Sequence, residues 1–392
     1  MGALSIVTGI DLPWGSPGGS MILLNDLYTA RRPFDATVFT LPAAGPGPEP
    51  GRIRQLTVPG AKEHAGPGFW AWTEAVARAL ERELRGADLR ETVVHCQHLA
   101  FGTTPALIMA LPRTPRIGLV HGTDLIYAAQ HPTQLAVLRH AAAAMDAIVA
   151  PTGAMAEWLL RLAPATPARK ITTIPWGIPD HLLTRPISHP RRTDGPLRIL
   201  FAGRMSSEKG AGELIRACRR LDEVELGLIG PADGHRTLLP LLAEKGHAVR
   251  YLGYLPREQL WERFAHYDVL AVPSTVAEAF CLTAIEAQAC GLPVLYQPVP
   301  RLLEVLGDSG LPVDFTASAA FTATVKSLVD DRGQLRALRA QGAANARRYP
   351  LSTTTDRLAE LTATVLGRPS VPHQRLRSAQ PPAAAYRLDT SI

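Results

Sequence analysis

Short apolar runs alternate along this chain with longer segments in which apolar residues recur at every third or fourth position. The short runs are rich in Val, Ile and Leu, which is typical of strands buried on both faces of a parallel sheet. The longer segments have the period of amphipathic helices. Because strand and helix patterns alternate through both halves of the chain, the sequence predicts an α/β protein with doubly wound parallel sheets.

The first half contains these elements in alternation. The predicted strands are Leu4–Thr8, Ala36–Leu41, Thr92–His95, Arg116–His121 and Ala147–Ala150. The predicted helices are Met21–Arg31, Phe69–Arg85, Thr103–Ala110, Gln134–Ala144 and Ala154–Leu162. The stretch Pro42–Pro67 is rich in Pro and Gly, so we expect an irregular loop there, with one short strand around Arg52–Val58.

The second half repeats the alternation. Its predicted strands are Leu197–Ala202, Glu225–Ile229, Val249–Leu252, Val269–Val272, Val294–Tyr296 and Gly310–Val313. Its predicted helices include Gly212–Leu221, Leu238–Lys245, Gln259–Tyr267, Ser318–Asp330, Arg332–Tyr349 and Leu351–Leu366.

Chain length favours more than one domain. A chain of 392 residues exceeds the size at which a single core usually stops growing. We assign residues 1–180 to a first domain and 196–348 to a second, with 181–195, rich in Pro and Arg, as the linker. A last amphipathic helix lies within 349–368, and 369–392 has little periodicity and is predicted to be a disordered tail.

Composition narrows the class of protein. Hydrophobic residues make up 46% and charged residues 19%, as in globular proteins. The four cysteines lie in or beside apolar runs without metal-site spacing, which predicts reduced thiols and a cytoplasmic location. The first residues lack the basic lead of a signal peptide, and no apolar run is long enough to span a membrane.

The chain is basic, with a net charge of +6 and a pI near 9.3. A nucleic-acid partner is disfavoured, because no basic motif is interleaved with aromatic residues. A basic cleft that binds a diphosphate explains the charge, and so does weak peripheral attraction to anionic lipid.

Two glutamates, Glu278 and Glu286, stand eight residues apart where the strand Val269–Val272 is followed by a loop and a helix. Ligands of open α/β sheets bind in the crevice at the carboxyl ends of the strands. A helix N-terminus there favours a phosphate, and each carboxylate can accept hydrogen bonds from sugar or ribose hydroxyls. The expected substrate-binding residues at this helix start are Phe280, Cys281, Leu282 and Thr283.

Two cations, Arg204 and Lys209, lie on the loop after the strand Leu197–Ala202. Fixed cations at this place suit a departing nucleoside diphosphate. The pattern Gly-Arg-x-x-x-Glu-Lys-Gly from Gly203, followed by Glu-x7-Glu from Glu278, resembles the retaining GT-B-fold glycosyltransferases of family four (glycosyl transferases group 1), which use sugar nucleotides. Each motif is weak alone, but their joint occurrence in this order is specific.

The resemblance implies a GT-B fold of two Rossmann-like domains that face a cleft. Residues 1–180 would form the acceptor side, residues 196–348 would bind the nucleotide sugar, and the helix within 349–368 would cross back to the first domain. Glu278 would hold the hydroxyls of the donor sugar and Glu286 the ribose. The alternative for Arg204 and Lys209 is an ordinary surface salt bridge with Glu208 or Glu213.

The first domain contributes further candidates. The loop Gly15–Ser20 lacks the G-x-G-x-x-G spacing, and Ser20 can cap the helix that follows. The resemblance implies that Gly18 and Gly19 face the diphosphate and the acceptor; a turn without a ligand is the alternative. It also implies that His121, at the end of a strand, lies against the donor sugar near the anomeric carbon. Asp124 would orient His121 or contact the acceptor, and His98 would line the acceptor cleft.

Two positions depart from the family pattern. Cys281 stands where the family usually has Gly, because backbone passes close to the donor there. Trp176, in Ile174-Pro175-Trp176-Gly177, replaces the usual Asn between the domains.

No cofactor or metal is expected. His95, His98 and His121 lack the spacing and the fourth ligand of a zinc site. No Asp-x-Asp motif occurs in the chain, and the cationic loop and the helix N-terminus can do the work of a metal.

We therefore expect a metal-independent, retaining hexosyltransferase that moves a hexosyl or amino-hexosyl unit from a UDP-linked sugar to a small alcohol. The small acceptor suggests bacterial natural-product biosynthesis of the aminoglycoside kind, and a lipid-linked acceptor is the alternative. Catalysis would be mostly electrostatic, through Arg204, Lys209 and the helix dipole. The alternatives are a GT-B-fold sugar-nucleotide 2-epimerase or hydrolase, and a non-catalytic protein that binds a nucleotide sugar.

Overall fold

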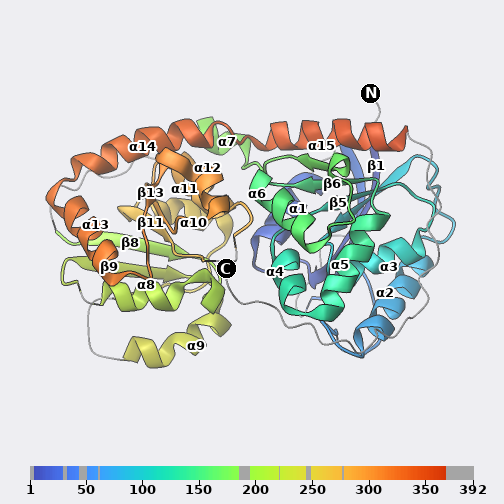
Figure 1. Cartoon of the computed structure of the whole chain (residues 1–392), viewed down its shortest axis with the longest axis horizontal. Helices are drawn as coiled ribbons and strands as arrows, with labels where there is room; N and C mark the ends of the chain where they lie inside the picture. The colour runs from blue at the N-terminus through green and yellow to red at the C-terminus, as the bar shows by residue number, and fades with distance from the viewer. Residues whose placement is uncertain are drawn as a thin grey trace.

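The protein consists of two lobes, each built on a parallel sheet between layers of helices (Figure 1). The structure, a computed structural model, describes residues 4–29, 33–43, 51–60, 62–184, 195–219, 221–243, 249–275 and 278–367. Both faces of the first sheet are buried, since the neighbours Ile6 and Val7 of its first strand pack into different hydrophobic clusters. This agrees with the apolar runs in the sequence and confirms the predicted α/β fold class.

The first lobe has a seven-stranded sheet in the order β3-β2-β1-β4-β5-β6-β7. Its strands are β1 (Leu4–Pro13), β2 (Phe34–Leu41), β3 (Ile53–Gln55), β4 (Thr92–Gln97), β5 (Arg116–Leu119), β6 (Ala147–Ala150) and β7 (Ile171–Thr173). Its helices are α1 (Gly19–Tyr28), α2 (Phe69–Glu83), α3 (Thr103–Ala110), α4 (Thr123–Gln130), α5 (Pro132–Ala144) and α6 (Gly153–Leu162).

The second lobe has a six-stranded sheet in the order β10-β9-β8-β11-β12-β13. Its strands are β8 (Leu197–Ala202), β9 (Val224–Ile229), β10 (Val249–Tyr251), β11 (Val269–Val272), β12 (Val294–Tyr296) and β13 (Leu311–Pro312). Its helices are α8 (Ala211–Cys218), α9 (Ala232–Ala243), α10 (Arg257–Phe264), α11 (Leu282–Ala289), α12 (Pro300–Leu306), α13 (Ser318–Asp330) and α14 (Gly333–Ala346).

In each sheet, the strand that comes first in sequence lies in the interior of the sheet, between two neighbours. β1 pairs with β2 on one side and β4 on the other, and β8 likewise pairs with β9 and β11, all in parallel. Strand order therefore reverses at these two strands, and the crevice beyond their carboxyl ends is where ligands of open α/β sheets bind. The glycine-rich loop after β1 and the Arg204–Lys209 loop after β8 begin at these carboxyl ends.

The last helix, α15 (Leu351–Leu366), belongs to the second half of the chain but packs on the first sheet, against β1, β4 and β5 (Figure 1). Thr362 Oγ1 lies 3.0 Å from His95 Nε2, inside the first lobe. Where the helix begins, the backbone runs so close to Gly177 that a Cβ there would lie 2.5 Å from Leu351 Cα. Glycine is therefore required at this crossing.

The structure corrects several sequence-based expectations. It adds α4, β7 and α12, and short segments of this kind span too few residues to display a period. It also shows a helix α7 at Asp180–Thr184, at the start of the expected linker, while residues 185–194 lie outside the described part. α9 begins at Ala232 rather than at Leu238. The expected tail, 369–392, also lies outside the described residues. No described helix is long and apolar enough to cross a membrane.

Candidate active site

Lys209 and Glu278, predicted from separate motifs, meet at the carboxyl end of the second sheet. The Lys209 ammonium lies 2.5 Å from Glu278 Oε1, which also accepts a hydrogen bond from Ser274 Oγ at 3.0 Å. Both partners are largely buried, with side-chain exposures of 17% and 12%. The close approach of Gly210 to Pro273 brings the two loops together, because a Cβ at Gly210 would lie 2.4 Å from the Pro273 carbonyl oxygen.

Helix α11 begins directly after this glutamate. Its N-cap is Cys281, which has a φ of 66°, in the left-handed region that favours glycine. This conformation explains why glycine is the usual family residue at this position. Leu282 and Thr283 are the first two residues of α11, so their N–H groups have no carbonyl partner within the helix. The N-terminus of α11, where the sequence predicts a phosphate site, therefore lies beside the Lys209–Glu278 pair.

Arg204 is more exposed than Lys209 and less tightly held. Its guanidinium lies 3.8 Å from Glu208, and the two side chains are 45% and 33% exposed. Arg204 therefore forms the surface salt bridge with Glu208 that was the alternative to a role in ligand binding, although the pair is weak. Glu213, the other possible partner, pairs with Arg216. Arg204 can leave Glu208 at little cost and turn toward an anionic ligand.

The glycine-rich loop of the first lobe borders open space. A Cβ added at Gly15, Gly18 or Gly19 would meet no atom within 4 Å, and Gly18 has a φ of 143°. Ser20 does not cap α1, because the N-cap is Gly18 and the Ser20 hydroxyl lies 2.9 Å from His98 Nε2. This contact holds the loop against β4.

His121 is half-buried among polar and aromatic side chains. Its Nε2 is 2.8 Å from Gln97 Oε1, and its ring stacks on Trp176 at a centroid distance of 6.0 Å. The ring of His98 is 4.4 Å away. Trp176, which replaces the family's Asn, therefore supports the face of His121. A Cβ at Gly122 would lie 2.7 Å from Ala279 Cβ, so the loop after His121 contacts the loop of Glu278 across the lobes.

Asp124 is fully buried. It has no exposed surface, and its carboxylate accepts hydrogen bonds from the backbone N–H groups of Leu99, His121 and Gly122 at 2.9, 3.3 and 2.8 Å. Of its two expected roles, this geometry fits the one that orients the backbone of His121.

Burial also shifts the protonation of these groups. It lowers the pKa of His95 and of His121 to about 3. Burial holds the pKa of His98 well below its usual range, and the nearby cations Lys62 and Arg204 act in the same direction. Burial raises the pKa of Asp124 to about 6, against the opposing effect of its backbone hydrogen bonds. Neutral histidines at neutral pH are the result.

These shifts predict that acid destabilises the fold. The stabilisation from neutral His95 and His121 is present above the unfolded pKa of about 6.5 and is lost as the pH falls toward 3. Asp124 has the opposite sign, because its raised pKa favours the protonated folded form as the pH falls through 6. His98, whose pKa is also lowered, adds to the loss, so the free energy of unfolding should drop by about 3–4 kcal/mol between pH 7 and pH 5. Urea denaturation at both pH values measures it, and equal values would contradict the assignment.

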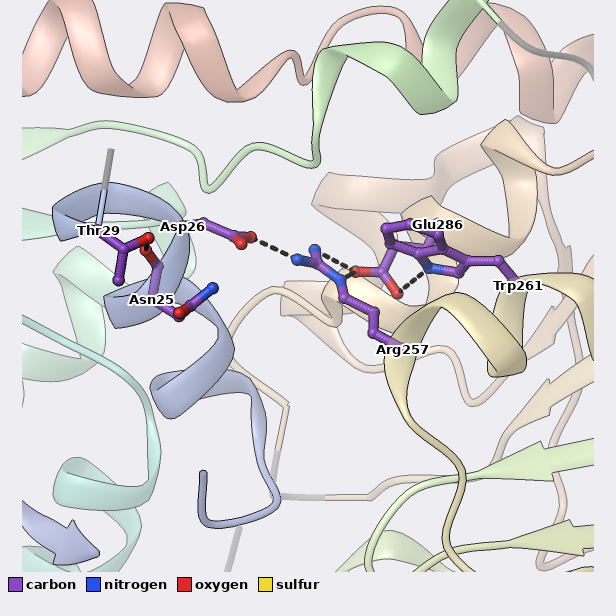
Figure 2. Close-up of polar contacts among 6 residues, drawn as sticks. All are labelled: Asn25, Asp26, Thr29, Arg257, Trp261 and Glu286. Atoms are coloured by element: carbon purple, nitrogen blue, oxygen red, sulfur yellow. Dashed lines mark hydrogen bonds and ion pairs between the residues drawn. The ribbon is translucent and has the colours of Figure 1, made fainter. Parts of the chain in front are cut away.

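Glu286 belongs to a separate network of polar contacts, with Arg257, Trp261 and Asp26 (Figure 2). Only 2% of its surface is exposed, and its carboxylate accepts hydrogen bonds from Arg257 Nε at 2.8 Å, Arg257 Nη2 at 2.5 Å and Trp261 Nε1 at 3.0 Å. Arg257 Nη1 donates to Asp26 of α1 at 2.6 Å. The glutamate predicted to hold a ribose therefore lies in a charged network at the lobe interface.

Sequence reasoning missed Asp26, Arg257 and Trp261. One signal was available: Arg257 is the first residue of α10, where the helix dipole favours an acidic residue. A cation in that position suggests a specific partner. Among the described residues, no group of three or more His, Cys, Asp or Glu could hold a metal ion.

Comparison with known proteins places these features in a family. The family described as "Glycosyltransferase Family 4" matches residues 27–182, and "Glycosyl transferases group 1" matches residues 187–348. A D-inositol 3-phosphate glycosyltransferase of Xylanimonas cellulosilytica is 32% identical over 377 residues, covering 86% of this chain and 89% of that protein. A protein of the same name from Catenulispora acidiphila is 31% identical and covers 68% of this chain and 70% of its own.

Solved structures show the same architecture. Sucrose-phosphate synthase from Thermosynechococcus elongatus has a TM-score of 0.77 at 18% identity, over 92% of this chain and 98% of that one. HepE of Anabaena, in complex with UDP and glucose, has a TM-score of 0.70 at 18% identity, over 92% and 100%. The GT-B architecture implied by the sequence motifs is confirmed.

Proposed function

Because this chain belongs to the glycosyltransferases of group 1 and family 4, we propose that it moves a hexosyl or amino-hexosyl unit from a UDP-linked sugar to a hydroxyl of a small acceptor, in the cytoplasm. One observation supports this most directly. The Lys209–Glu278 pair lies beside the N-terminus of α11 and faces the His121 loop of the other lobe. The cation and the helix N-terminus suit a diphosphate, the carboxylate suits the hydroxyls of its sugar, and the loop of the other lobe suits an acceptor.

The proposed division of labour follows from charge and position. Arg204, Lys209 and the α11 N-terminus stabilise the diphosphate as the glycosidic bond breaks. Glu278 has its described hydrogen bonds on Oε1, so Oε2 serves the sugar hydroxyls. Neutral His121 can donate or accept a hydrogen bond beside the reacting carbon. Since no carboxylate is assigned as a covalent nucleophile, we propose attack on the face from which the diphosphate leaves, with retention of configuration.

The relatives suggest the class of acceptor. Proteins about 31–32% identical to this chain are named for D-inositol 3-phosphate, so we propose a cyclitol or a related small polyol, free or phosphorylated. The test incubates purified protein with UDP-, GDP- and dTDP-sugars against cyclitols and cyclitol phosphates, and mass spectrometry detects the product. Conversion of a UDP-sugar to product supports the proposal. A 2-epimer or free sugar formed at the same rate without any acceptor would favour the alternative reactions.

We expect transfer to continue in excess EDTA. The paired cations and the helix N-terminus supply the positive charge that a metal would otherwise bring to the diphosphate. The measurement compares initial rates with and without chelator, and after addition of Mg²⁺ or Mn²⁺. Complete loss of activity that either ion restores would show that a metal handles the diphosphate.

A further inference from the structure

Arg257 is the side chain that joins two carboxylates from different lobes (Figure 2). Its Nε and Nη2 atoms donate to Glu286 Oε1 in the second lobe, at 2.8 and 2.5 Å. Its Nη1 atom donates to Asp26 Oδ2 in the first lobe, at 2.6 Å. The guanidinium is planar and its donors point in fixed directions, so one edge is committed to each partner.

The network is buried, which makes its charges costly to separate. Side-chain exposure is 13% for Arg257, 9% for Asp26 and 3% for Glu286. Burial alone would lower the pKa of Arg257, but the two carboxylates outweigh it and raise that pKa. Burial raises the pKa of Glu286 and of Asp26, while Arg257 acts in the opposite direction. Removal of one partner would leave a buried charge without compensation.

Helix α10 also fixes the direction of the Glu286 carboxylate. Trp261, one turn beyond Arg257, donates to Oε2 at 3.0 Å, and the guanidinium lies 5.1 Å from the centre of its ring. Oε1 receives two N–H groups and Oε2 one. A carboxylate accepts about four hydrogen bonds, so Oε2 retains capacity for a hydroxyl while its orientation is set by α10.

A second arginine has a similar arrangement at the other glutamate. Arg301 Nε donates to the backbone oxygen of Glu278 at 2.7 Å, and its guanidinium lies 4.9 Å from the ring of Trp158 in the first lobe. On the same helix, Glu304 accepts the N–H groups of Gly153 and Ala154 at the start of α6. Glu286 and Glu278 are thus each connected to the first lobe through an arginine, Arg257 for Glu286 and Arg301 for Glu278.

We propose that Arg257 is a positioning residue with two separable tasks. Its Nε–Nη2 edge orients Glu286 for the nucleotide, and its Nη1 atom, through Asp26, holds α1 and its glycine-rich loop against the donor-binding lobe. The first task rests on the proposed function, because it takes Glu286 as the nucleotide contact. The second concerns only the arrangement of the lobes.

Two substitutions separate these tasks. Asp26→Ala leaves the Arg257–Glu286 contacts in place, so the dissociation constant of UDP should stay within about twofold while turnover of a UDP-sugar falls about tenfold. Arg257→Met removes both contacts, so UDP binding should weaken about tenfold and turnover should fall as well. Calorimetry with UDP and steady-state kinetics measure the two effects. Asp35→Ala, which removes an exposed ion pair with Arg52 in the same lobe, is the control and should change neither.

Small-angle scattering without any nucleotide tests the second task alone. Both variants should show a larger radius of gyration than the wild type and the control, because the lobes lose a buried connection. If Arg257→Met is unfolded, Arg257→Lys replaces it: the charge stays, the two-pronged contact with Glu286 is lost, and UDP binding should still weaken.

The outcomes distinguish the two hypotheses. If Asp26→Ala weakens UDP binding as much as Arg257→Met does, or if neither variant changes the lobe arrangement, the separation of tasks is wrong. If the wild type does not bind UDP while scattering still shows the change, the proposed function fails and the connection between the lobes stands.

Discussion

Replacing Arg204 or Lys209 by alanine is expected to lower turnover by about 10²–10³-fold, equivalent to roughly 3 kcal/mol of transition-state stabilisation. Negative charge grows on the diphosphate as its bond to the sugar breaks, so a fixed cation there binds the transition state more tightly than the ground state. Affinity for the donor should therefore fall much less than turnover does.

The two variants should differ in stability. Lys209 pairs with the largely buried Glu278, and its removal leaves that carboxylate without its cation, so some loss of folding stability is expected. Arg204 is 45% exposed and 3.8 Å from Glu208, so its variant should unfold like the wild type.

Steady-state kinetics with a UDP-sugar and thermal unfolding measure both quantities. Arg216→Ala is a matched control, because Arg216 forms an exposed ion pair with Glu213 on the next helix. Turnover like that of the wild type in both the Arg204 and Lys209 variants would contradict the proposed diphosphate site.

The second large effect is expected when either glutamate is replaced, and each replacement should impair recognition of a different part of the donor. Glu278→Gln should damage use of the donor sugar, and Glu286→Gln should weaken binding of free UDP, each by about 1.5–3 kcal/mol. An amide forms weaker hydrogen bonds with hydroxyls than a carboxylate does, and its NH2 group presents a donor where an acceptor is needed. Glu278→Gln also weakens the pairing with Lys209.

Calorimetric titration of UDP, together with kinetics on the UDP-sugar, separates the two roles. Glu262→Gln is the control, because Glu262 is an exposed residue of α10, the helix whose Arg257 and Trp261 donate hydrogen bonds to Glu286. If Glu286→Gln binds UDP like the wild type while Glu278→Gln does not, the roles are assigned the wrong way round.

Local sequence patterns were sufficient to predict site residues that lie in a loop directly after a predicted strand. The Arg204–Lys209 loop lies directly after β8, and Glu278 lies in the loop between β11 and α11. Both positions could be predicted because a strand, a loop and a helix are consecutive in sequence and the crevice lies at the strand's carboxyl end. The family was recognised from the same two segments, and the comparisons confirm it.

The contacts of these residues could not be predicted in the same way. Lys209 bonds Glu278, 69 positions away, and Asp26 bonds Arg257, 231 positions away. Ser20 contacts His98 rather than capping its own helix. Asp124 is turned inward to backbone N–H groups. No periodicity or short motif encodes which distant side chain occupies the space beside another.

Hydrophobic period and turn residues act over a few positions, so the sequence alone was enough to predict the α/β class, most of the elements and the residue types at the carboxyl ends of the strands. Which side chains are buried together, and which lobe each one contacts, became clear only in the folded chain. It placed Glu286 between Arg257 and Trp261 and joined that network to Asp26, because burial makes each of these charges dependent on partners that only the folded chain brings within hydrogen-bonding distance.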